Sequence, residues 1–179
     1  STIIEFGDGF LPKTTILVNF KIMPNNKILT KYGQFFIFGK SNIRNKQYDV
    51  LIFAHKDIEV AIIPSFIKRI AQSAFGNCTK LKQIEFEENS QLQVIDEYAF
   101  LASSLKVDII TIPPSVIHIK QFEFNCDNIR SFEFQESSEL CLIDEAFVGS
   151  NIGCISLKLK FLKIKSESFS VSKIQIIEI

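Results

Sequence analysis

The chain repeats one pattern of apolar residues every 22 to 25 positions, and this repetition restricts its fold more than any other feature. The stretches 70–86 (IAQSAFGNCTKLKQIEF) and 119–134 (IKQFEFNCDNIRSFEF) keep their apolar positions while their polar residues change. A unit of this length cannot bury its own apolar face. The copies must therefore stack and share one continuous core, as they do in solenoid proteins.

Several apolar columns are kept through five units. One column is phenylalanine, at spacings of 25, 24, 23 and 22 residues: Phe75, Phe100, Phe124, Phe147 and Phe169. An isoleucine column lies four or five residues earlier: Ile70, Ile95, Ile119, Ile143 and Ile164. A pair at spacing two closes each unit: Ile84 and Phe86, Ile110 and Ile112, Phe132 and Phe134, Ile155 and Leu157, Ile177 and Ile179. Such a pair predicts a β-strand, and successive copies of the strand should pair in parallel.

The amino-acid pattern of the repeat resembles that of a known family. The stretches 63–86 (IPSFIKRIAQSAFGNCTKLKQIEF) and 112–126 (IPPSVIHIKQFEFNC) look like the BspA-type leucine-rich repeat, I-P-x-x-V-x-x-I-x-x-x-A-F-x-x-C-x-x-L-x-x-I-x-I. The stretch 48–70 also resembles the BspA-like surface proteins of Trichomonas. The resemblance implies a leucine-rich-repeat solenoid with a parallel β-sheet on its concave side. Short strands and helical turns are expected on the other faces, with the Ala-Phe step on such a turn because alanine favours helix.

The resemblance covers about two-thirds of the chain. We expect about five BspA-type repeats of 22 to 26 residues in 58–179, and irregular N-terminal repeats with an insertion in 1–57. In that first part, TILVNFKI, QFFIF and DVLIFA read as strands, with PNN and GKSN as turns. Later units are degenerate, since Glu123 replaces the alanine before its phenylalanine and the last unit lacks proline.

The composition of the chain argues against several classes of function. Lys+Arg is 20 and Asp+Glu is 20, so nothing favours nucleic acid or an anionic membrane surface as a partner. No apolar stretch is long enough for membrane insertion of this segment, and the N-terminus does not read as a signal peptide. The four cysteines form no CxxC pair and the two histidines lie far apart, so we expect neither a metal nor a cofactor.

Individual reactive residues allow two interpretations each. The carboxylate pairs in 85–89 (EFEEN) and 96–100 (DEYAF) are either catalytic or solvated surface and caps, and we expect the second. No nucleophile motif or phosphate loop accompanies them, so the chain should not be an enzyme. Cys78 and Cys126 either fill a small inward slot or serve as reactive or bridging thiols. His118 is expected at a surface position of a short strand.

One row of residues is a candidate binding surface. Between the two inward residues of each strand lies one outward residue, which in leucine-rich folds lines the concave sheet: Glu85, Thr111, Glu133, Ser156 and Glu178. A neighbouring row, after the leucine column, is basic: Lys82, Lys106 and Arg130. The two rows either neutralise each other for solubility or match the charges of a partner.

The resemblance also implies a function. In such families the repeats are taken to serve adhesion and protein binding. We therefore expect a non-enzymatic protein-binding module, part of a BspA-like adhesion protein at the cell surface or secreted, with a host-cell or extracellular matrix protein as ligand. The alternative is an intracellular, cytoplasmic scaffold or adaptor built on the same repeats.

Overall fold

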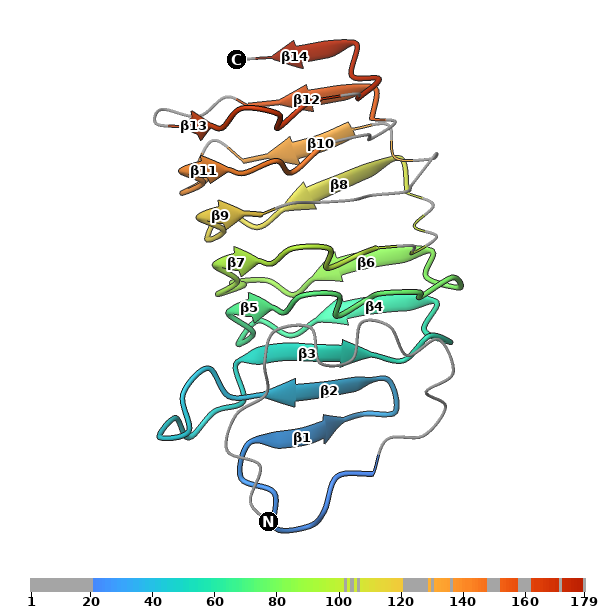
Figure 1. Cartoon of the computed structure of the whole chain (residues 1–179), viewed down its shortest axis with the longest axis vertical. Coiled ribbons are helices and arrows are strands. Elements are labelled where there is room, and N and C mark those ends of the chain that lie inside the picture. The colour runs from blue at the N-terminus through green and yellow to red at the C-terminus, as the bar shows by residue number, and fades with distance from the viewer. Residues whose placement is uncertain are drawn as a thin grey trace.

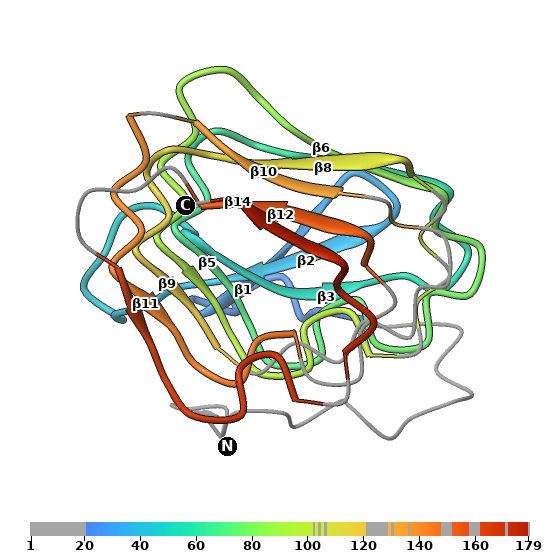
Figure 2. The same ribbon diagram turned by 90° about the horizontal axis from the view of Figure 1, so that it is seen from above.

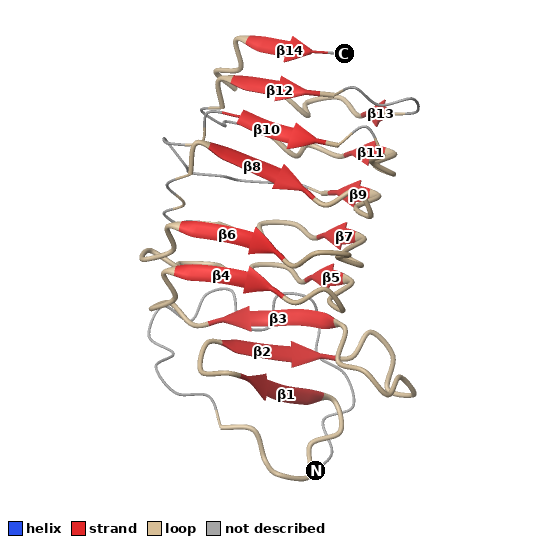
Figure 3. Cartoon of the chain, turned by 180° about the vertical axis from the view of Figure 1, so that it is seen from behind, coloured by secondary structure: helices blue, strands red, loops and turns tan. Residues whose placement is uncertain are grey.

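The computed structural model describes residues 21–101, 103, 105, 107–120, 129, 131–135, 137–147, 152–157, 162–170 and 172–178. These residues form a β-solenoid of about five turns built from parallel sheets, which confirms the expected leucine-rich-repeat fold. Figures 1 and 3 show the turns stacked one above another along the long axis. Each turn after the first contributes one short strand of two residues and one longer strand of three or four residues.

The short strands, together with β3 (Val50–Ala54), form one sheet along the stack. Its parallel part comprises β3, β5 (Arg69–Ile70), β7 (Val94–Ile95), β9 (His118–Ile119), β11 (Leu142–Ile143) and β13 (Lys163–Ile164). The longer strands line another side: β4 (Val60–Ile63), β6 (Gln83–Phe86), β8 (Ile109–Ile112), β10 (Ser131–Phe134), β12 (Cys154–Ser156) and β14 (Ile176–Glu178). Seen along the stack in Figure 2, these two sets of strands lie on different sides of the molecule.

The register of the short strands confirms the isoleucine column. Ile70 pairs with Ile95, and the ladder continues through the next two isoleucines to Ile164. All members are buried except Ile164, which is 41% exposed. Among the described residues, β13 with Ile164 is the edge strand of this sheet and pairs with β11 alone.

The phenylalanine column forms a second ladder inside the turns. The rings of Phe75 and Phe100 stack with centroids 4.9 Å apart, and those of Phe147 and Phe169 stack at 5.7 Å. Phe124, Cys126, Phe161 and Ile179 lie outside the described residues. Identical side chains one repeat apart therefore pack on one another, as a stacked array requires.

The turns around these rings differ from the helical turns expected at the Ala-Phe step. The residue two positions before the phenylalanine has a positive φ in four repeats: Ser73, Tyr98, Glu145 and Glu167. A left-handed residue interrupts a right-handed helix, and no helix forms in the described part of the chain. The N–H of Phe75 instead donates to the carbonyl of Ala99 in the next repeat, at 2.8 Å. The turns are thus joined from repeat to repeat.

An antiparallel unit precedes the parallel stack. β1 (Leu29–Tyr32) pairs with β2 (Phe36–Gly39), and β2 pairs with β3, which then joins the parallel sheet through β5. The strands expected in QFFIF and DVLIFA are therefore present, while most of TILVNFKI lies outside the described residues. Aromatic contacts fix the unit to the stack, since the Phe36 ring meets Phe75 at 6.3 Å and the Phe38 ring meets Phe66 at 5.9 Å.

Charged residues of alternating sign follow the short strands. Lys120 Nζ lies 3.0 Å from Asp96 Oδ1, and Lys165 Nζ lies 2.6 Å from Asp144 Oδ2. The Asp96 carboxylate is buried and also pairs with Arg69. Buried charges are retained only when they are paired, so this column joins three repeats electrostatically.

Candidate protein-binding face

The outer face of β4, β6, β8, β10, β12 and β14 carries two parallel columns of residues. Each strand contributes one residue to each column. In the second column Thr111, Glu133, Ser156 and Glu178 follow one another by strand register. Glu85 occupies the same position on β6, where it pairs with Ile62 of β4. We call this surface the outer face, and it contains the acidic row expected from the sequence.

The members of the expected acidic row differ in exposure. Glu85, Thr111 and Glu133 are exposed, while Ser156 is half-buried. The Gln83 side-chain amide donates to the Glu85 carboxylate at 2.5 Å. Glu85 is therefore held in place by its own strand.

The basic row is partly engaged elsewhere. Lys82 Nζ lies 2.7 Å from the carboxylate of Glu59 in the preceding repeat, and Lys80 lies 2.6 Å from Asp57. The hydrogen bond from Lys82 lowers the pKa of Glu59, and that from Lys80 lowers the pKa of Asp57. Lys106 and Arg130 lie outside the described residues.

The first column of the outer face was missed by reasoning from the sequence. It holds exposed apolar side chains, with Val60 at 47%, Ile109 at 51% and Ile176 at 55% exposure, and Ile62 in the second column is 50% exposed. Strand alternation could have revealed them, because residues two positions apart share a face. The outer face is thus mixed apolar and acidic.

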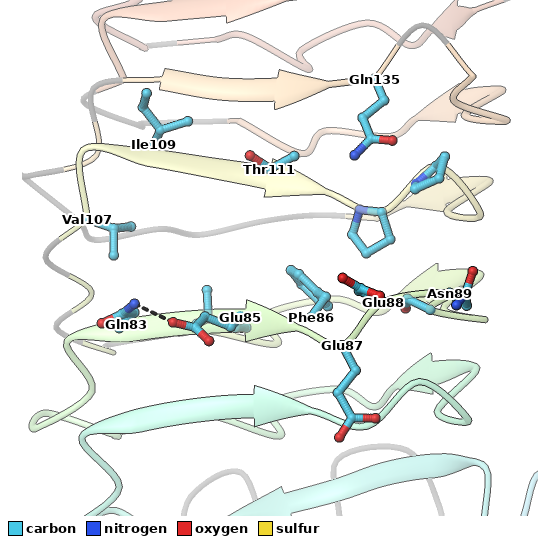
Figure 4. A pocket seen from close by; sticks show the side chains of 14 residues that line it. Gln83, Glu85, Phe86, Glu87, Glu88, Asn89, Val107, Ile109, Thr111 and Gln135 are labelled. Carbon is cyan, nitrogen blue, oxygen red and sulfur yellow. Dashed lines mark hydrogen bonds between the residues drawn. The ribbon is translucent and has the colours of Figure 1, made fainter.

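An open hollow of about 760 Å³ interrupts the outer face between β6 and β8. Figure 4 shows Val107, Ile109 and Thr111 on the β8 side and Gln83, Glu85 and Phe86 along β6. The Ile84 and Phe86 side chains are half-buried here, whereas their counterparts on β8, Ile110 and Ile112, are buried. The hollow therefore exposes part of the core.

A comparison with protein families identifies the repeat. Residues 46–178 match the model described as "BspA type Leucine rich repeat region", in six copies. The chain belongs to the BspA-type leucine-rich repeat family. This family is usually linked to protein binding and is generally non-enzymatic, and no catalytic family matches. Comparisons with curated proteins and with solved structures found no match.

Cys78 and His118, the reactive residues considered in the sequence, occupy structural positions in the BspA-type repeats. Cys78 is buried, and burial raises the pKa of its thiol to about 12. Its Sγ faces the carbonyl of Ala54 at 3.6 Å, so it fills the expected inward slot. His118 is half-buried rather than at the surface, and burial lowers its pKa. Neither residue lies on the outer face.

The part of the BspA-type chain that the structure describes contains no cluster of three potential metal ligands. The same residues include no helix with the length and hydrophobicity needed to cross a membrane. What the outer face offers chemically is a fixed grid of apolar and acidic side chains on hydrogen-bonded strands.

Proposed function

We propose that this chain is a protein-binding module of a BspA-like adhesion protein, presented at the cell surface or secreted, and that its outer face contacts a host-cell or extracellular matrix protein. The family is usually linked to protein binding, which supports the general class. The outer face supports the location, because its side chains vary in type on a rigid lattice of parallel strands.

One observation carries the proposal most directly. Exposed apolar residues stand beside exposed carboxylates on the outer face, with Ile62 at 50% exposure next to Glu85 in register. Exposed apolar surface rimmed by polar groups is typical of protein–protein contact sites. Charges at such a rim mainly speed association and are screened by salt.

The test replaces Glu85, Glu133 and Glu178, the three glutamates of the second column, together by glutamine. A matched control replaces Glu97, Glu139 and Glu167, which are exposed and lie on none of the strands of this face. Both variants lose three negative charges, and each surface substitution should change stability by less than about 0.5 kcal/mol. We expect only the first variant to capture less protein from matrix or host-cell extract, with a weaker dependence on salt.

Equal capture by the wild type and both variants at every salt concentration would contradict the proposal. Equal weakening by both triple variants would show a general charge effect instead of a contact on the outer face. The captured protein is identified by mass spectrometry and then tested as a purified partner.

A second candidate is an intracellular scaffold. Cys78, Cys141 and Cys154 are free thiols, and Cys141 is exposed. Exposed free thiols favour a reducing compartment, since oxidising compartments convert them to disulfides. Fractionation of the source cells with an antibody against this chain would separate the two locations.

A further inference from the structure

The two strands that border the hollow are not joined to each other. Among the described residues β6 pairs only with β4, and β8 pairs only with β10. On the short-strand side of the same turns, β7 and β9 remain paired in register. The break coincides with the longest spacing between strand pairs, since Ile84 and Ile110 are 26 residues apart while Ile110 and Phe132 are 22 apart.

The edge of β6 presents backbone groups to the hollow. The N–H of Glu87 donates to the carbonyl of Ile63 on β4 at 3.1 Å. Successive residues of a strand turn their backbone groups to opposite sides, so the N–H and C=O of Ile84 and Phe86 face β8. No strand within the described part of the chain pairs with this edge.

The edge of β8 is arranged in the same way. The N–H of Ser131 on β10 donates to the carbonyl of Asp108 at 3.0 Å, which places the groups of Ile110 and Ile112 toward β10. The backbone groups of Ile109 and Thr111 therefore face the hollow. Two unpaired edges that face each other across an open space form a template for a strand from another chain.

The side chains around the hollow define the chemistry of that strand. Glu85 and Glu88 line it, and the fourteen described lining residues include no lysine or arginine. A third carboxylate, Glu87, accepts a hydrogen bond from the N–H of Ser65 at 2.8 Å and points toward β4 in Figure 4. The apolar lining includes Phe86 and Ile109.

We propose that the hollow between β6 and β8 binds an extended, basic peptide segment of a partner protein as an added β-strand. Its inward side chains are apolar and pack against Ile84 and Phe86, while its outward side chains are lysine or arginine and meet Glu85 and Glu88. Strand addition is a recurring mode of peptide recognition, with backbone bonds giving affinity and alternate side chains giving specificity. The inference rests on the proposed protein-binding function and assigns it a site and a ligand class.

The probe is a display library of random linear decapeptides selected on the whole wild-type chain. We expect enriched sequences in which basic and apolar residues alternate. An enriched peptide should bind the Glu85→Lys variant at least about tenfold more weakly, because charge reversal replaces an attraction by a repulsion. The matched control is Glu97→Lys, because Glu97 is exposed, lies on no strand of the outer face and does not line the hollow.

A second pair of variants tests the apolar contact. Ile109 lines the hollow at 51% exposure, and Ile62 lies outside it at 50%. Ile109→Thr should weaken peptide binding and Ile62→Thr should not, since both changes keep a β-branched residue at equal exposure. Amide exchange measured by nuclear magnetic resonance should show new protection at Ile84 and Phe86 when the peptide binds.

Two results would overturn the inference. One is that no alternating basic peptide is enriched. The other is that Glu85→Lys and Glu97→Lys weaken binding equally, without new amide protection at Ile84. Either result leaves the proposed function standing if the triple glutamine variant of the outer face still loses its protein partner. If the triple glutamine variant instead captures the protein partner as well as the wild type does, both proposals are refuted.

Discussion

Replacing Phe75 by alanine should lower the free energy of unfolding by about 3–5 kcal/mol. Phe75 is fully buried, and its ring lies 4.9 Å from that of Phe100 and 6.3 Å from that of Phe36. Its removal leaves a cavity between the antiparallel unit and the next repeat. The cavity cannot collapse easily, because the Phe75 N–H and the Ala99 carbonyl hold the two turns at a fixed separation.

The same change at Phe169 provides the internal comparison. Phe169 is half-buried and stacks on Phe147 at 5.7 Å. It should cost less, about 1–2 kcal/mol, since less area is lost and the site is more open to relaxation. Urea titration of both variants, read from the midpoints at unchanged slope, measures the difference. Equal losses, or a larger loss at Phe169, would refute a core built from ladders with nearest-neighbour contacts.

Three further predictions concern buried or half-buried polar groups. Arg69→Met should lower the free energy of unfolding by about 3 kcal/mol, because it leaves the buried Asp96 carboxylate with one cation. Asp96→Asn should lower it by only about 1–2 kcal/mol. Thermal or urea unfolding of the two variants measures the difference. The Cys78 thiol, whose pKa burial raises to about 12, should react with iodoacetamide at pH 8 only on unfolding, whereas the exposed Cys141 should react first in mass spectra. Burial lowers the pKa of His118, so the unfolded chain binds its proton at higher pH than the folded one. Stability should therefore fall as the pH drops below about 6.5, and His118→Gln should reduce that fall in urea titrations at several pH values.

The ladders were predictable from sequence because each column repeats one kind of side chain. One column holds the isoleucines from Ile70 to Ile143, and another holds Phe75 and Phe100. Because side chains within a column have the same size, a single register buries them in every repeat. A slip by one residue would turn each apolar strand residue outward. The hydrophobic pattern alone therefore fixes the stacking order.

The turns were less predictable because the residue types at these positions do not indicate their backbone conformation. Ser73, Tyr98, Glu145 and Glu167 share a left-handed backbone but include no glycine. Hydrogen bonds such as that from the Phe75 N–H to the Ala99 carbonyl join a turn to the next repeat, and these bonds exist only after stacking. Local preference for helix at the alanine lost to this tertiary constraint.

The candidate face was predicted only in part for a similar reason. The alternation of strand residues identified Glu85 and Glu133, and it applies equally to Ile109, which was overlooked. The pairing of Lys82 with Glu59 depends on the strand register between β4 and β6. The hollow coincides with one long repeat, whose effect on strand pairing becomes visible only in three dimensions.

The residues around the hollow explain how an open pair of edges can persist in a stacked array. Exposed edges invite pairing with other copies of the same chain, and proteins block this with charges and prolines. Glu85, Glu88, Pro113 and Pro114 all line the hollow. A second copy of this acidic edge would meet like charges, whereas a basic strand would meet opposite ones. The features that discourage self-association therefore favour the alternating basic peptide, and the Glu85→Lys variant should show both effects, with weaker peptide binding and increased self-association in analytical ultracentrifugation.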